Sequence, residues 1–227
     1  METSIINNLT DLKILMEKTA SVKKYEGYYF YKCLNFLPDS LLPEMHSSAT
    51  RWLEDTRKTT LEEVFPPEAS RNLLNSGNAI SCLEESVWVT FYTEAKKHIA
   101  QYCKIADIDI KKIRLHSSWI TRLHNLDFPS VHTKEELKRR LSLHNTFGNM
   151  HSHKGNPIGL IYYLKNPDPK YGTIVKVSDK KIFNNNGEEN SIMIFDPRAY
   201  HTALYPPIKE TKEYPRITIV ADCEFID

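Results

Sequence analysis

The stretch NTFGNMHSHKGNPIGLIYYLKNP, residues 145–167, places two histidines directly before an apolar, aromatic run that is typical of a buried β-strand. These histidines, His151 and His153, are separated by one residue. Residues i and i+2 of an extended chain point to the same face, so both imidazoles can reach one metal ion. The sequence therefore predicts half of a metal site at the start of a strand.

The later part of the chain supplies the other groups of the predicted site. His201 lies in SIMIFDPRAYHTALYPP, residues 191–207, and Arg216 opens the strand-like segment RITIVADCEF. Arg216 and Thr218 are two residues apart, so a guanidinium and a hydroxyl face the same side and can bind one carboxylate. We interpret the set as a metal site with an anion clamp.

The three imidazoles do not select a metal by themselves, because Fe, Zn, Cu and Ni all accept such ligands. A three-ligand face with open positions is the arrangement of non-heme iron oxygenases, whereas structural zinc needs a fourth ligand and no cysteine lies near the motif. An HxH pair is a weak signal in a chain with nine histidines. The combination with a strand-borne histidine and an arginine is more specific.

The order of elements predicts an α+β chain with a mainly β core. Residues 1–110 have a mostly helical texture, and the strongest predicted helix covers residues 82–107. From about residue 111 the apolar period changes to two, and several short strands follow between Gly-, Pro- and Asn-rich turns. We expect one domain, 1–227, in which N-terminal helices pack on one sheet of an antiparallel sandwich or barrel formed by 111–227. The apolar stripe expected on that helix consists of Val87, Val89, Tyr92, Ala95, Ile99 and Cys103.

Composition limits the possible partners and location. The chain has 227 residues, 41% of them hydrophobic, and a formal net charge of +1, which argues against a nucleic-acid partner. It has four cysteines and no CxxC pair, as expected of free thiols in a reducing compartment. Without a signal-peptide pattern or an apolar run near the ~20 residues that span a bilayer, we expect a cytoplasmic protein with no membrane partner. The oligomeric state stays open.

Taken together, these segments resemble the 2-oxoglutarate/Fe(II)-dependent oxygenases, in particular a prolyl-hydroxylase-like subgroup. The resemblance covers roughly residues 85–225 and implies a double-stranded β-helix, or jelly roll, as the core. The segments that carry the resemblance, in order, are SSWITRLHN (117–125), HSH (151–153), IGLIYYLKNPDP (158–169), IMIFDPRAYHTALYPP (192–207) and RITIVAD (216–222).

The resemblance implies a role for each matching residue. His151 would be the first iron ligand and His201 the distal one, while Arg216 and Thr218 would bind the C5 carboxylate of 2-oxoglutarate. Tyr163 would line the co-substrate pocket, although a core aromatic explains it equally well. The implied cofactors are Fe(II) and 2-oxoglutarate. With O₂, the enzyme would hydroxylate a small molecule or a protein side chain and release succinate and CO₂, with no catalytic residue beyond the metal ligands.

The chain departs from the family pattern at one ligand. Most members have HxD or HxE, and this chain has His153 where the carboxylate is expected. His153 either completes an all-histidine face or does not ligate and leaves a two-histidine site. Asp196, in the turn before His201, could supply a carboxylate instead.

Two further functions remain open at this point. A three-histidine, cupin-type metal oxygenase that does not use 2-oxoglutarate would keep the fold, with Arg216 binding the carboxylate of its substrate. A non-catalytic binding protein would explain the missing carboxylate. Candidate substrate residues are Arg122, His124 and Asn145, which an exposed loop or a sheet edge explains equally well.

Overall fold

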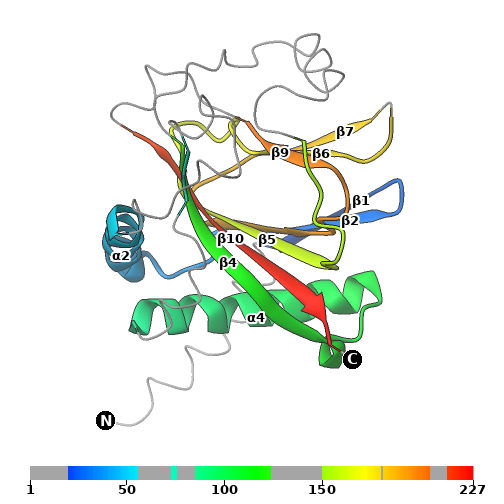
Figure 1. Cartoon of the computed structure of the whole chain (residues 1–227), viewed down its shortest axis with the longest axis horizontal. Helices are drawn as coiled ribbons and strands as arrows, with labels where there is room; N and C mark the ends of the chain where they lie inside the picture. The colour runs from blue at the N-terminus through cyan, green and yellow to red at the C-terminus, as the bar shows by residue number, and fades with distance from the viewer. Residues whose placement is uncertain are drawn as a thin grey trace.

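Two antiparallel sheets form the β core of this computed structural model (Figure 1). The structure describes residues 20–55, 73–75, 85–123, 150–179, 181–204 and 214–226. The seven-stranded sheet has the order β1-β2-β8-β5-β10-β4-β3, and the three-stranded sheet has the order β7-β6-β9. The strands are β1 (Ala20–Tyr25), β2 (Tyr28–Cys33), β3 (Leu73–Asn75), β4 (Ile113–Leu123), β5 (Ile158–Lys165), β6 (Thr173–Lys176), β7 (Ile182–Asn185), β8 (Ser191–Phe195), β9 (His201–Ala203) and β10 (Arg216–Phe225).

The central strands β5 and β10 are buried on both faces, and alternate residues enter two different cores. Ile217 and Ile219 of β10 belong to the core between the large sheet and the helices. Tyr163 of β5 belongs to the second core, between the two sheets, and Val220 of β10 packs against it. Because Thr218 is paired with Tyr163, the face of β10 that carries Thr218 and Val220 looks into the space between the sheets. The predicted anion-binding residues of β10, Arg216 and Thr218, lie on this interior face.

The helices cover the opposite face of the large sheet, where α4 (Ser86–Ala106) runs across the strands and α2 (Leu42–Asp55) lies beside them (Figure 1). The short 3₁₀ turns η1 (Asp39–Leu41) and η5 (Ile110–Lys112) precede α2 and β4. The Glu85 side chain joins the two helices, since it accepts hydrogen bonds from Ser48 at 2.7 Å and Trp52 at 3.0 Å. None of the described helices is long and apolar enough to cross a membrane.

The buried stripe of α4 differs in part from the predicted one. Val87, Ala95, Ile99 and Cys103 are buried as expected, whereas Val89 is 50% exposed. The stripe instead runs through Trp88 and Phe91, which are completely buried, and through His98 and Tyr102. Both stripes have helical spacing, and the larger area of the aromatic rings decides which face turns to the sheet.

The N-terminal part contributes strands as well as helices. β1 and β2 form a hairpin, and β2 extends the large sheet by pairing with β8. The turn residues Glu26 and Gly27 both have positive φ, 47° and 88°, as a two-residue turn that follows the right-handed strand twist requires. Residues 1–110 are therefore more than a helical support. The division at residue 110 within a single domain stays a prediction.

Candidate metal centre

The three predicted histidines come together at one end of the space between the sheets. His151 and His201 form a β-bridge. The His151 amide donates to the His201 carbonyl at 3.0 Å, and the His201 amide donates to the His151 carbonyl at 2.9 Å. The His153 amide donates to the Pro197 carbonyl at 2.9 Å. Consequently, the segment before β5 is joined to β9 and to the turn that leads into β9. One possible ligand atom from each histidine lies within 4.8 Å of those of the other two, as binding of a single ion requires.

His201 is held in the form and orientation of a metal ligand. Its Nδ1 atom is 2.9 Å from the Ala199 carbonyl, which can only accept, so Nδ1 carries the proton and Nε2 keeps its lone pair. Burial and, to a smaller extent, the neighbouring His151 lower the pKa of His201 to about 3. The neutral imidazole that binds metals is therefore its resting form. His151 is exposed and His153 is half-buried, so the centre lies where the interior reaches the surface.

A residue that sequence reasoning missed, Asp222 of β10, lies against the centre. Its Oδ2 atom is 2.5 Å from Nδ1 of His153, and the Asn156 amide donates to the same oxygen at 3.1 Å. Asp196, the carboxylate considered from the sequence, is bound instead by Arg198 through Nε at 2.8 Å and Nη2 at 2.6 Å. The spacing held a signal for Asp222, because it lies six residues after Arg216 and thus on the same face of an extended strand.

Arg216 is buried at the other end of the same face of β10. Its side chain is among the largest that are fully buried, and its Nε donates to the Tyr171 carbonyl at 2.9 Å and its Nη2 to the Gly172 carbonyl at 3.3 Å. The guanidinium carbon is 5.3 Å from the centre of the Tyr163 ring, a distance at which a cation is attracted to the ring face. Thr218 is also buried, and it is paired with Tyr163 in the sheet. The structure thus brings the three predicted co-substrate residues together.

The arginine end and the histidine end are connected through β6. Gly172, which binds Arg216, directly precedes β6, and Val175 of β6 is paired with His201. Two residues of extended chain separate Gly172 from Val175, and the three steps between them correspond to about 10 Å. The anion clamp and the metal ligands are therefore joined by one short strand.

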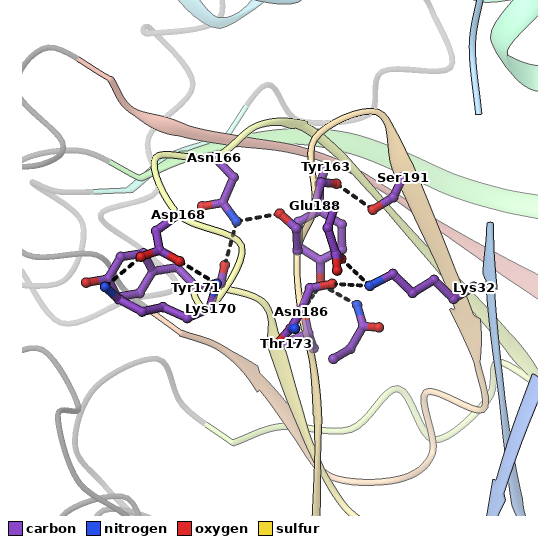
Figure 2. A network of polar contacts seen from close by, with 12 residues as sticks. Lys32, Tyr163, Asn166, Asp168, Lys170, Tyr171, Thr173, Asn186, Glu188 and Ser191 are labelled. Carbon is purple, nitrogen blue, oxygen red and sulfur yellow. Dashed lines mark hydrogen bonds and ion pairs between the residues drawn. The ribbon is translucent and has the colours of Figure 1, made fainter. Parts of the chain in front are cut away.

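The Tyr163 hydroxyl is part of the packing between the sheets. It lies at hydrogen-bond distance, 2.7 Å, from the Thr173 hydroxyl (Figure 2). It also accepts a hydrogen bond from the Asn185 amide at 3.3 Å. Complete burial raises the pKa of Tyr163, which keeps the phenol protonated. Tyr163 is therefore both a core aromatic and a neighbour of Arg216. Its contact with a co-substrate stays a prediction.

One of the two carbonyls that bind Arg216, that of Tyr171, is fixed by Asn166. Its side-chain amide donates to the Tyr171 carbonyl at 3.1 Å and to the Gly187 carbonyl at 2.7 Å (Figure 2). Its backbone amide donates to the Glu189 carboxylate at 2.6 Å. Asn166 thereby joins the β5–β6 and β7–β8 loops, so the surroundings of Arg216 are built before any anion binds.

Gly172 has no room for a side chain, and we expect Gly172→Ala to disturb this frame. An added Cβ would lie 1.6 Å from the Asn185 carbonyl oxygen, a backbone atom of the neighbouring strand β7. Overpacking of this kind costs about 1–3 kcal/mol or more in the free energy of unfolding. The matched control is Gly155→Ala, where an added Cβ meets nothing within 4 Å. Denaturant unfolding of both variants tests the prediction, which equal midpoints would contradict.

The three candidate substrate residues are not brought together by the described part of the chain. Arg122 lies in β4, where it is paired with Ile217 of β10. His124 and Asn145 lie outside the described residues. A substrate role for these three residues stays a prediction.

No protein-family model and no curated protein matches the sequence. Solved structures do match. SnoK, a non-heme α-ketoglutarate-dependent carbocyclase from nogalamycin biosynthesis, has a TM-score of 0.60 and 12% identity over 87% of this chain and 80% of its own. SnoN, a non-heme α-ketoglutarate-dependent epimerase from nogalamycin biosynthesis, has a TM-score of 0.57 and 15% identity, over 97% of this chain and 84% of SnoN. A prolyl-4-hydroxylase of Pseudomonas putida has a TM-score of 0.54 and 8% identity, over 87% of this chain and 92% of the hydroxylase.

At these identities the likeness establishes the fold. The chain has the jelly-roll fold of these enzymes, with helices packed on one sheet, and the fold predicted from the sequence is confirmed. The resemblance to 2-oxoglutarate-dependent oxygenases is confirmed at the level of structure, and the predicted histidine triad is present within that fold.

Proposed function

We propose that this protein is a non-heme Fe(II)- and 2-oxoglutarate-dependent dioxygenase that hydroxylates a small molecule or a protein side chain. One observation carries the proposal. Possible ligand atoms of His151, His153 and His201 lie within 4.8 Å of one another, and strand β6 joins this cluster to the carbonyl that binds the buried Arg216. A metal-binding face beside a buried cation suits a co-substrate with a chelating end and a carboxylate end.

The donor set fits Fe(II). The three imidazoles would hold one face of the ion and leave its other positions open. When bound, iron and 2-oxoglutarate supply the oxidative chemistry, in which O₂ is consumed and 2-oxoglutarate is converted to succinate and CO₂.

The protein residues bind and orient. The planar guanidinium of Arg216 and the Thr218 hydroxyl would bind the distal carboxylate of 2-oxoglutarate, and the Tyr163 ring limits the movement of the guanidinium. The second core consists of buried apolar side chains packed between the two sheets, next to Tyr163. Those on the central strands β5 and β8 are Ile161, Met193 and Phe195.

An anaerobic titration tests the proposal. Metal-free protein receives Fe(II) and then 2-oxoglutarate, and we expect the weak visible charge-transfer band of a 2-oxoglutarate chelate. Glutarate is the dicarboxylate of the same length that lacks only the 2-oxo group that closes the chelate, and succinate is the shorter dicarboxylate; neither should give the band. A band with 2-oxoglutarate and none with glutarate or succinate supports the proposal. Iron binding without any band would refute it.

The all-histidine face favours one second candidate, a cupin-type three-histidine oxygenase that uses no 2-oxoglutarate. In this case Arg216 would bind the carboxylate of the substrate itself. Iron binding without a 2-oxoglutarate band is the result that this candidate predicts. Protein that binds neither iron nor another divalent metal would favour a non-catalytic binding protein.

The remaining features of the proposal concern the substrate and its setting. The similar structures include two enzymes of nogalamycin biosynthesis and a prolyl-4-hydroxylase, which supports both a small molecule and a protein side chain as the substrate class. We retain O₂ as co-substrate, a cytoplasmic location and a single domain as parts of the proposal. The near-neutral charge of the chain still argues against a nucleic-acid substrate.

A further inference from the structure

Asp222 is a buried carboxylate that the proposed chemistry has not yet used. It is 4% exposed, on the interior face of β10, and its nearest charged contact is with the His153 ring, at 2.5 Å between Oδ2 and Nδ1. The contact has the distance of an ion pair without the alignment of a hydrogen bond. Among the described residues, neither Oδ1 of Asp222 nor Nδ1 of His153 has a hydrogen-bond partner. A buried carboxylate with so few partners is costly to the fold.

The neighbouring strand β5 and the turn before it lie close to this carboxylate. Gly159 is paired with Asp222 in the β5–β10 ladder, and a Cβ on Gly159 would lie 3.0 Å from Pro197 and 3.5 Å from Oδ1 of Asp222. Asn156, whose amide donates to Oδ2, is itself held by a bond of 3.1 Å from its backbone N–H to the His153 carbonyl. Asn156 thus joins the turn that carries His153 to the strand that carries Asp222, and Gly159 leaves little room for a side chain beside Pro197.

The contact between Asp222 and His153 favours one of the two ring nitrogens of His153 as the metal-binding atom. A carboxylate beside Nδ1 favours the tautomer with the proton on Nδ1, and this tautomer leaves the lone pair on Nε2. The Ala199 carbonyl has the same effect on His201. Two of the three imidazoles therefore have an acceptor behind the ring, as metal-ligating histidines regularly do.

The Asp222 carboxylate also supplies negative charge close to the three histidines. The cluster of possible ligands in the described chain consists of three imidazoles and holds no carboxylate, so it contributes no negative charge to a divalent ion. Asp222 provides one negative charge directly behind one of the imidazoles. A carboxylate in this position makes the imidazole a stronger donor to the metal.

We propose that Asp222 is a positioning residue that fixes the metal-binding tautomer of His153 and provides the negative charge of an otherwise neutral ligand set. The inference rests on the proposed metal site but not on the use of 2-oxoglutarate. The cost of burying the carboxylate is offset by metal affinity, and so removal of its charge weakens metal binding without weakening the metal-free fold.

The test compares Asp222→Asn with Glu224→Gln. Glu224 lies two residues further along β10 and also contacts a histidine, since it is 3.1 Å from Nδ1 of His116, but this pair is outside the site. We measure Fe(II) affinity anaerobically and Co(II) affinity in air by competition with a chelator. We expect Asp222→Asn to weaken both about 10–100-fold, and Glu224→Gln to leave both unchanged. The thermal midpoint of metal-free Asp222→Asn protein should be at or above that of the wild type.

A second measurement needs no metal. Nitrogen-15 NMR of the metal-free protein reports the tautomer of each histidine, and we expect His153 to be protonated on Nδ1 in the wild type. Asp222→Ala removes the acceptor altogether, so His153 should no longer prefer the tautomer with the proton on Nδ1. His201 should keep its Nδ1-protonated tautomer. Because this signal is read in folded protein, it also shows whether either variant has lost its fold.

The outcomes separate this inference from the proposed function. Equal metal affinity of wild type and Asp222→Asn overturns the role of Asp222, whether or not a 2-oxoglutarate band forms. A wild type that binds metal without a 2-oxoglutarate band refutes the proposed function, and a 10–100-fold loss in Asp222→Asn then still supports the role of Asp222. A wild type that binds no divalent metal overturns both.

Discussion

His201→Ala should abolish tight metal binding and, with it, all turnover that depends on the metal. His201 is the buried member of the triad, and its Nδ1 bond to Ala199 holds the ring in one orientation. Loss of a partner behind a ligand costs about 10–100-fold in metal affinity, so loss of the ligand itself should cost more. We expect at least a 100-fold weaker affinity for Fe(II), measured by anaerobic chelator competition, and no 2-oxoglutarate band.

The experiment has to separate ligand loss from unfolding. Alanine leaves the Ala199 carbonyl without its donor and opens a small cavity, which lowers the free energy of unfolding by about 1–3 kcal/mol. His201→Gln fills most of the volume, and circular dichroism checks that both variants are folded. The control is His116→Ala, because His116 is a half-exposed histidine of β4 that pairs with Glu224 outside the site. Tight Fe(II) binding by folded His201→Ala protein would show that the triad is not the metal site.

Arg216→Met should weaken 2-oxoglutarate binding strongly while Fe(II) binding is unchanged. Methionine has a similar length and fills the buried volume, but it removes the charge and the planar fork that fit a carboxylate. Truncation of one partner of a buried, hydrogen-bonded charge pair costs about 2–5 kcal/mol. The dissociation constant for 2-oxoglutarate should therefore rise by about 30-fold or more. The measurement is titration of the iron-loaded protein with 2-oxoglutarate, followed by the chelate band.

The structure explains why this variant should still fold. The Tyr171 carbonyl keeps the Asn166 amide as a donor, and the Gly172 carbonyl keeps the Leu204 amide at 3.0 Å. Neither carbonyl is orphaned when Arg216 is removed. Arg216→Lys retains the charge without the fork and should give an intermediate affinity. The control is Arg114→Met, at an exposed arginine of β4. Unchanged 2-oxoglutarate affinity in Arg216→Met would assign the arginine to the core of the fold alone.

Much of the site could be predicted from the sequence because its residues lie on extended segments. The period of two places His151 beside His153 and Arg216 beside Thr218, and the structure keeps both pairs on the expected faces. The strand from Arg216 to Phe225 is found at the residues predicted for it. A local rule suffices in these places, since backbone geometry alone fixes the direction of the side chains.

Other features depend on choices that local patterns do not make. Two helical stripes were compatible with α4, and contact with the sheet selected the one with Trp88 and Phe91 over the one with Val89. The N-terminal hairpin joins the large sheet because β2 pairs with β8, more than 150 residues later in the sequence. Such pairings depend on the packing of the whole core, which no short stretch of sequence contains.

The sequence by itself determined the identity of the three histidines, the strand that carries Arg216 and the mainly β fold with helices on one sheet. The tertiary structure decided which carboxylate lies against the histidines. Asp196 is close to His201 in sequence, yet Arg198 binds it, whereas Asp222 contacts His153 from another strand. The reason is physical. The direction of a side chain along a strand follows from local geometry, but the approach of two strands is set by register and packing across the sheet.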